Sequence, residues 1–435
     1  MDLLPLIVLF VSFFLLMGIG LPISFAMGLS TLATLAMMFS FDQALFIMAQ
    51  KMVVGFDSFT LLALPFFILA GNIMTTGGIA RRLINLAKMA GQPLPGSLAH
   101  TNILANMMFG SVSGSAVASA AAVGGVMAPE MRRAGYDMKF GAAVNIVSCT
   151  TGLLIPPSGT FIIYSLISGG TSVAALFVAG YLPGILLGGA LMVVAGIMAA
   201  RAGHKGEGLP SLRELGFAVA DAILPLGLVV IIMGGIISGI VTATEAAGIA
   251  VIYAFVLALF VYREMTYRDL PKIVMDTAMT TGIVMLLVGI SSAMSWTMTF
   301  ADMPYMIQQA LEAVSENPLM VLLFINISLL IIGTFMDLTP ALLIFTPIFL
   351  PVAQDMGMDP VHFGVMMTLN LCIGICTPPV GSALFVGSSI AGVPVWSVLR
   401  PIIPFYLAFA AVLAIVTLVP DVSLLLPRLF LGYGE

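Results

Sequence analysis

The sequence predicts a membrane protein built only of helices, in two related halves that enter the bilayer from opposite sides. Composition is the first reason: 60% of the 435 residues are apolar and only 8% are charged, whereas a soluble domain carries about 25% charged residues. Apolar stretches of about 20 residues, the length of a membrane-crossing helix, also recur along the chain. The third reason is that glycines, prolines and aspartates repeat at one fixed separation. A water-soluble globule is excluded.

Apolar runs between glycine, proline and charge clusters place the membrane spans. In the first half we expect spans near 3–18, 21–40, 57–75 and 173–200. In the second half we expect them near 216–240, 246–262, 276–300 and 401–420. Amphipathic stretches at 42–54, 79–91 and 303–317 are expected to lie along the membrane surface.

Each half also contains a pair of shorter apolar arms. In the first half the arms 98–109 and 116–128 are joined by 110–115, and in the second the arms 319–332 and 340–352 are joined by 333–339. At 1.5 Å per helical residue such arms reach only about 20 Å, less than the ~30 Å hydrocarbon core. The sequence therefore predicts two re-entrant hairpins.

A long apolar segment follows each hairpin and is broken by a proline pair. The breaks fall at Pro156-Pro157 within 138–169 and at Pro378-Pro379 within 361–391. A shift of 222 positions superimposes these pairs, and it also superimposes Gly152 on Gly374. Such residues set backbone geometry, so the match indicates an internal repeat.

Charge orients the two halves. The first hairpin is flanked by the basic residues Arg81, Arg82, Lys88, Arg132, Arg133 and Lys139. The second is flanked by the acidic residues Asp302, Glu312, Glu316, Asp355 and Asp359, without Lys or Arg. By the positive-inside rule the first hairpin enters from the cytoplasm, the second enters from the periplasm, and the N-terminus is periplasmic. Repeats of opposite orientation are typical of secondary transporters.

The proline pairs suggest where a cation would bind. Each pair removes backbone donors, so carbonyls near 152–154 and 374–376 are expected to lack helical partners. Free carbonyl oxygens, with hydroxyls from Thr151, Thr160 and Thr377, suit Na⁺ in a broken helix. The alternative is a pair of ordinary proline kinks.

The hairpin tips suggest where an anion would bind. Ser113 and Ser115 surround Gly114 just before an Ala-rich arm, so exposed N–H groups there could hold a carboxylate. Equally, Ser115 could be an ordinary N-cap. Asp337 in the second tip is a functional candidate because intramembrane carboxylates usually are. Alternatively it caps a helix beside Thr339, which resembles an N-cap before Pro340.

Other classes of protein find little support. Cys149, Cys372 and Cys376 lie in apolar segments and are expected to be buried and free. No paired nucleophile and base, metal cluster or nucleic-acid-binding feature is present in the sequence, so an enzyme is not expected. An ion channel is disfavoured because tips entered from opposite faces indicate alternating access.

Five segments carry a resemblance to a known family. They are 110–125, 129–136, 155–158, 180–184 and 377–381. With nearly the whole chain, they resemble the large membrane subunit of tripartite ATP-independent periplasmic (TRAP) transporters. The resemblance implies uptake of an organic carboxylate across the bacterial inner membrane, driven by Na⁺. It also implies a separate four-helix membrane subunit as partner and a periplasmic binding protein that delivers the substrate.

The resemblance further implies an elevator mechanism. The mobile transport domain would comprise 95–170 and 318–392, and the scaffold 1–94, 171–317 and 393–435. Na⁺ sites would involve Gly110, Ser113, Gly152 and Pro156 in one half, with Gly333, Gly374, Thr377 and Pro378 in the other. Substrate would be bound by Ser113, Ser115, Thr160 and Asp337.

Details of the resemblance bear on the substrate. The run 169–181 looks most like members that carry sialic acid, with C4-dicarboxylates the next expectation. Some members have an acidic residue where this chain has Ser119, so no carboxylate acts there. The alternative is a stand-alone divalent-anion/Na⁺ symporter of similar two-hairpin architecture, which needs no binding protein.

Overall fold

The computed structural model describes residues 4–303, 305–307, 309 and 317–434. Every regular element within these residues is a helix, which confirms the predicted class. Eight of the described helices are long and apolar enough to cross a bilayer, and a pair bent by 53° at the first proline pair makes a ninth candidate span. The predicted surface stretch 303–317 falls mostly outside the described residues.

The helices of the first half follow the predicted order. They are α1 Leu4–Gly18, α2 Ile23–Met38, α3 Phe41–Phe56, the 3₁₀ turn η1 Phe59–Leu62, α4 Ala63–Thr76, α5 Ile79–Gly91, α6 Ser97–Ser113, α7 Ala116–Arg133, α8 Met138–Ser148, α9 Thr151–Leu154, α10 Gly159–Ile167 and α11 Val173–Arg201. Both predicted surface stretches, α3 and α5, are helical. The broken helix has a second interruption, at 149–150, besides the proline pair.

The second half repeats this order after a loop at 202–211. Its helices are α12 Leu212–Ile237, α13 Ala243–Val256 with the π-helical extension η2 Leu257–Val261, α14 Leu270–Phe300, α16 Pro318–Phe335, α17 Leu338–Asp355, α18 Pro360–Gly374, α19 Ser382–Ala391, α20 Val395–Leu418 and α21 Asp421–Leu431. The C-terminal helix α21 was not predicted.

The hairpin arms are longer than predicted. Helices α6 and α7 have 17 and 18 residues, and α16 and α17 have 18 each, so each arm reaches about 26 Å. The first arm continues through Gly110 and ends at Gly114, whose φ of +63° suits glycine. The connections therefore shrink to Gly114-Ser115 and Met336-Asp337.

The structure shows the internal repeat over more of the chain than the sequence does. The bounds of α7 and α17 differ by 222 at both ends, as do the first residues of α8 and α18 and of α11 and α20. Thr150 even meets its own counterpart, because its carbonyl oxygen lies 3.7 Å from the Cys372 Sγ. The two halves are thus related about an axis that passes between these residues.

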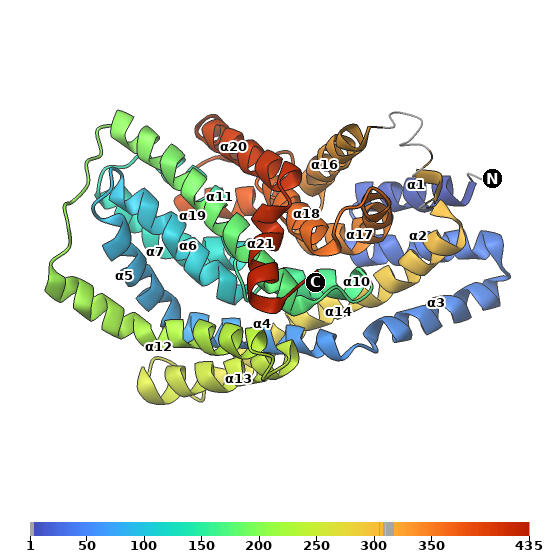
Figure 1. Cartoon of the computed structure of the whole chain (residues 1–435), viewed down its shortest axis with the longest axis horizontal. Helices are drawn as coiled ribbons and strands as arrows, with labels where there is room; N and C mark the ends of the chain where they lie inside the picture. Colours follow the sequence, from blue (N-terminus) through green and yellow to red (C-terminus); the bar gives the residue numbers. More distant parts are fainter. Residues whose placement is uncertain (1–3, 304, 308, 310–316, 435) are drawn as a thin grey trace.

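The helices pack in two groups. The hairpins and broken helices pack with α11, α20 and α21, and the second arm of each hairpin lies on the broken helix of the other half, α7 on α19 and α17 on α10. Helices α1–α4 and α12–α14 form the other group, and Figure 1 shows the two hairpins on opposite sides of the molecule. The amphipathic α5 joins the groups, packing on both α6 and α12.

Ion pairs fix α5 to the second group. The Arg82 guanidinium donates to Asp221 at 3.0 Å and to Glu264 at 2.9 Å, and it lies 3.5 Å over the Tyr262 ring. Arg81 contacts the same Glu264 at 2.7 Å. Helix α5, which precedes the first hairpin, is therefore anchored to α12 and to the segment that follows α13.

Candidate functional site

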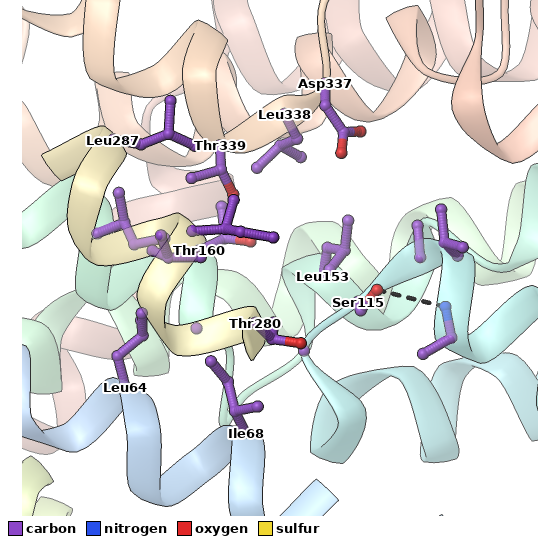
Figure 2. A pocket seen from close by; sticks show the side chains of 18 of the residues that line it. Leu64, Ile68, Ser115, Leu153, Thr160, Thr280, Leu287, Asp337, Leu338 and Thr339 are labelled. Carbon is purple, nitrogen blue, oxygen red and sulfur yellow. Dashed lines mark hydrogen bonds between the residues drawn. The ribbon is translucent and has the colours of Figure 1, made fainter. Parts of the chain in front are cut away.

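A cavity of about 530 Å³ lies where the two hairpin tips meet. Its wall combines both tips, both broken helices and parts of α2, α4 and α14. Figure 2 shows Asp337 on one side of this space and Ser115 on the other. The predicted substrate residues Ser113, Ser115, Thr160 and Asp337 all line it. The fold thus gathers residues that lie up to half the chain apart.

Ser115 is the N-cap of α7 in the first tip. Its Oγ accepts a hydrogen bond from the Ala118 N–H at 3.3 Å, so the capping interpretation is confirmed. The hydroxyl proton is still free to donate toward the cavity. Beside it, the Ser113 Oγ lies 3.4 Å from the carbonyl oxygens of both Gly110 and Ser115.

Asp337 occupies the N-cap position of α17 without capping it. No side-chain bond to the helix is present, and its Oδ1 instead accepts a hydrogen bond of 2.9 Å from the Ser382 Oγ. The prediction that Thr339 caps this helix is wrong, because α17 begins at Leu338. Pro340 then falls in the first turn, where a helix needs no N–H donor.

Thr160 stands at the start of α10 and faces the cavity with an unused hydroxyl. The residue is 4% exposed, it lines the cavity, and no described residue forms a hydrogen bond with its Oγ1. The Thr160 Oγ1 is not among the enclosed, unpaired polar atoms of the described residues, so it opens onto the cavity and is free to bond a ligand. Thr160 is therefore a strong candidate to bind a ligand in this cavity.

The electrostatics of the cavity come from the backbone more than from side chains. Among the described residues that line it, Asp337 alone is charged, and none is Lys, Arg or His. Helices α7, α10 and α17 begin at its wall, so their free N–H groups and partial positive charge face the space. These three helix ends are where an anion would be stabilised.

Close glycine contacts seat each hairpin on a broken helix. A Cβ at Gly152 would lie 2.3 Å from the Gly110 Cα, and a Cβ at Gly374 would lie 2.5 Å from the Gly333 Cα. Only glycine permits this approach. Four of the predicted Na⁺ residues are thus brought together, Gly110 with Gly152 and Gly333 with Gly374. Pro156 and Pro378 lie in the adjoining breaks, where both Pro–Pro bonds are cis.

Four of the six expected orphan carbonyls have partners. Leu153 O accepts from the Ser158 hydroxyl at 2.6 Å, Ile375 O from the Ala383 N–H at 3.2 Å, and Cys376 O from the Tyr406 hydroxyl at 2.7 Å. Gly374 O likewise accepts from the Thr377 N–H at 2.8 Å. The prediction was wrong for these four carbonyls, because residues after each break and Tyr406 of α20 supply donors.

Oxygen ligands for a cation nevertheless remain. A carbonyl oxygen has a second lone pair, and the Thr151 and Thr377 hydroxyls donate to Ser148 O and Ile373 O while keeping their own lone pairs. The described residues contain no cluster of His, Cys, Asp or Glu suited to a metal. A donor set of carbonyls and hydroxyls fits a hard cation such as Na⁺.

Sequence reasoning missed two features near the cavity. The first is Ser382, the partner of Asp337. The second is a buried amide network under the first tip, in which the Asn106 Nδ2 donates to Asn102, Asn145 and Ser148 at 2.7 to 3.2 Å. Ser119, where an acidic residue had been considered, donates to the Asn106 Oδ1 at 2.7 Å.

Two expectations about side chains outside the cavity are settled. Cys149, Cys372 and Cys376 are buried and free, as predicted. Arg132 at the end of the first hairpin donates to the Ala391 carbonyl at 2.9 Å, at the C-terminal end of α19. It lies outside the cavity wall, so it does not contact a ligand there.

Comparison with known proteins gives one consistent family. Residues 10–422 match the model of the tripartite ATP-independent periplasmic transporter, DctM component. The chain is 55% identical to the uncharacterized protein YgiK of Salmonella typhimurium over 98% of both chains. It is 41% identical to the sialic acid TRAP transporter large permease SiaM of Vibrio cholerae, over 96% of this chain and 97% of that one.

Further matches concern substrate and fold. The chain is 41% identical to the C4-dicarboxylate TRAP transporter large permease DctM of Pseudomonas aeruginosa, over 93% of this chain and 94% of that one. Among solved structures, the Alcanivorax borkumensis YdaH transporter is similar with a TM-score of 0.58, 13% identity and 90% coverage of both chains. That likeness concerns the fold alone.

Proposed function

The chain belongs to the DctM family, the large permease of TRAP transporters, and on that premise we propose that it performs Na⁺-coupled uptake of an organic carboxylate. The family is one of bacterial multi-span transporters and not of enzymes, and its members work with a small membrane subunit and a periplasmic binding protein. We propose that the small subunit is a separate four-helix chain and that the N-terminus is periplasmic.

The observation that carries the carboxylate assignment is the cavity between the hairpin tips. It offers the N-terminal ends of α7, α10 and α17, together with the hydroxyls of Ser113, Ser115 and Thr160. A carboxylate is the small anion whose two oxygens can accept several such hydrogen bonds. Relatives named for sialic acid and for C4-dicarboxylates support this class; we place sialic acid first and C4-dicarboxylates second.

Na⁺ would bind beside the cavity, once in each half. One site would be formed around Gly110, Ser113, Gly152 and Pro156, and the other around Gly333, Gly374, Thr377 and Pro378. The oxygen donors and the matched glycine contacts support these positions. When bound, Na⁺ would offset the negative charge that a carboxylate brings into a cavity without basic side chains.

Movement of the hairpins and broken helices would carry the cavity between the two faces of the membrane. We propose one change to the predicted boundaries: α11 and α20 move with the hairpins. Helix α20 packs mainly on the broken helices, and α11 packs on α20, α21, the first hairpin and the broken helices. Helices α1–α4 and α12–α14 would remain as the scaffold. The chain then passes between the two parts at the link between α5 and α6, at the loop 202–211 and between α14 and α16.

Transport assays in proteoliposomes test this proposal. The chain is reconstituted with its small subunit and supplied with loaded binding protein, and uptake is compared with and without external Na⁺. We expect uptake to require Na⁺, and undiminished uptake in its absence would overturn the coupling. Uptake that needs no binding protein would indicate the stand-alone symporter, and conductance far above carrier turnover would indicate a channel.

The proline pairs give a second test. Alanine replacements of Pro156-Pro157, or of Pro378-Pro379, should raise the Na⁺ concentration for half-maximal uptake by about tenfold, since roughly 1.4 kcal/mol of Na⁺ binding free energy corresponds to that factor. Expression and gel-filtration behaviour should change less than the Na⁺ dependence. Lost expression with unchanged Na⁺ dependence would instead favour ordinary proline kinks.

A further inference from the structure

The cavity has a second polar wall, on helices that the proposed movement leaves in place. Besides the hairpins and broken helices, it is lined by residues of α2, α4 and α14. The polar residues among these are Ser24 of α2, Asn72 of α4 and Thr280 of α14, and Figure 2 shows Thr280 in this wall. The four predicted substrate residues, in contrast, all belong to the part that would move.

The polar residues of the scaffold wall lie toward one side of the membrane. Ser24 is the second residue of α2, Asn72 is four residues from the end of α4, and Thr280 is in the first half of α14. With the N-terminus periplasmic, as proposed above, those parts of the helices are nearer the cytoplasm. Phe67 and Leu287, nearer the periplasmic ends of α4 and α14, are apolar. The hydrogen-bonding groups of this wall are therefore on its cytoplasmic side.

The amide of Asn72 is held in one orientation by its neighbour. Its Nδ2 donates to the Thr277 Oγ1 at 2.9 Å, between the packed helices α4 and α14. The Thr277 hydroxyl gives its own proton to the Ile273 carbonyl at 2.7 Å. It can therefore only accept from Asn72, and the group that faces it must be the NH₂. The Asn72 Oδ1 is thereby directed away from Thr277.

Asn72 has bonding capacity left for a ligand. No described residue donates to its Oδ1, and one of its two amide protons is also unused. The Oδ1 is not among the enclosed, unpaired polar atoms of the described residues, and Asn72 lines the cavity, so the amide opens onto that space. It can accept from a hydroxyl or amide N–H through Oδ1, and it can donate to a ligand oxygen through the remaining proton.

The repeat gives Asn72 no equivalent amide. A shift of 222 positions carries Asn72 onto Met294 and Thr280 onto Ser58. Because the two halves are inverted, we expect the scaffold wall that the site meets at the other face to be formed by these equivalents. Ser58 keeps a hydroxyl, but Met294 cannot replace an amide. A hydrogen bond from the scaffold amide is thus available on one side of the membrane only.

We propose that Asn72 binds the polar end of the substrate only while the site is on the cytoplasmic side. The carboxylate is held by the moving hairpins and travels with them. A hydroxyl, amide or second carboxylate group at the far end bonds the Asn72 amide, and this bond breaks when the hairpins move toward the periplasm. Thr277 is the positioning residue for the amide. This inference rests on the proposed function and adds to it a contact that belongs to one state.

Counterflow measures the two sides of the membrane separately. Proteoliposomes that contain the large and small subunits are loaded with unlabelled sialic acid, and labelled sialic acid is supplied outside on the binding protein in Na⁺ buffer. The binding protein acts at the periplasmic face, so it selects molecules of one orientation. The external concentration for half-maximal uptake reports the periplasmic state, and the internal concentration for half-maximal counterflow reports the cytoplasmic state. Succinate replaces sialic acid if the wild type carries only succinate.

Asn72→Leu removes the amide at similar volume. We expect the internal half-maximal concentration to rise about tenfold, which corresponds to about 1.4 kcal/mol, while the external one changes less than twofold. Thr277→Val keeps the amide but no longer fixes it, so the internal value should rise about threefold. Thr75→Val is the control and should change neither value, because its hydroxyl bonds only the Gly71 carbonyl of its own helix and it lies outside the cavity wall.

Three results in Asn72→Leu would overturn the inference: equal shifts at both faces, a shift at the external face alone, or no shift. In each case uptake by the wild type would leave the proposed function standing. If the wild type takes up neither sialic acid nor succinate with Na⁺ and binding protein, the proposed function fails as well. Gel filtration checks folding, and Asn72→Ser, which should raise the internal value at least threefold, serves in place of a leucine variant that does not fold.

Discussion

The two hairpin tips have the same backbone plan and different chemistry. Each tip connects helices whose bounds superimpose after a shift of 222 residues, and each seats a glycine against a glycine of a broken helix. The first tip then presents serine hydroxyls, while the second presents the carboxylate of Asp337. The comparison teaches that packing residues preserve the repeat, whereas the residues that face the cavity have diverged into complementary roles.

The layers beneath the tips differ too. The first hairpin rests on α8 through the network of Asn102, Asn106, Asn145 and Ser148. The second hairpin contacts α18 through one amide pair, in which the Asn370 Nδ2 donates to the Oδ1 and the backbone oxygen of Asn326 at 2.8 and 2.9 Å, and through two weak bonds to methionine sulfur. The first tip should therefore be the more rigid of the two.

The largest effect on transport is expected at the glycine contacts, which both halves have. Gly152→Ala and Gly374→Ala each place a Cβ within 2.5 Å of opposing backbone, and because backbone cannot move aside, we expect a cost of about 3 kcal/mol. Na⁺-dependent uptake in proteoliposomes should fall at least tenfold in both. Gly125→Ala is the control, since its Cβ meets nothing within 4 Å. An effect in only one of the two variants would mean that one contact is dispensable.

An intermediate effect, on thermal stability, should differ between the two hairpins. Asn106→Leu leaves several buried partners unsatisfied, which costs about 2 kcal/mol or more, whereas Asn370→Leu disrupts one pair and should cost about 1 kcal/mol. Thermal unfolding in detergent measures both. Equal losses of stability would contradict the difference in rigidity.

The smallest effect concerns capping. Ser115→Ala removes the cap of α7 and should cost about 1 kcal/mol, while Asp337→Ala removes no cap. Thermal unfolding should therefore shift more for the serine variant, although transport by both variants is expected to suffer. A larger shift for Asp337→Ala would show that its bond to Ser382 supports the fold.

Much of the fold follows from hydropathy, proline and charge. The helices at the predicted spans, the helices α3 and α5 and the breaks at both proline pairs are where apolar length and proline chemistry place them, although α1 and α2 are shorter than a candidate span. The lengths of the hairpin arms were not predicted, because Gly110 and Gly333 continue their helices while they pack against other glycines. Helix α21 was missed because it is short, amphipathic and contains Pro427.

The cavity shows a similar limit. The four predicted substrate residues stood out as polar groups in apolar segments, and all four line the cavity. The hydrogen bonds to the Leu153 and Cys376 carbonyls were not predicted, because the donors Ser158 and Tyr406 come close to these oxygens only in the folded chain. Ser382, in contrast, was accessible in principle, since the repeat shift carries Thr160 onto it.

The contact between Thr150 and Cys372 lies at the axis that relates the two halves. In a twofold-symmetric dimer, a residue on the axis meets its own copy in the other subunit. Here Thr150 meets Cys372, the residue at the equivalent position of the second half. The fold therefore has the internal arrangement of a twofold-symmetric dimer within one chain. A substitution at Thr150 or Cys372 changes a contact that both halves share, whereas one at either tip changes a single half.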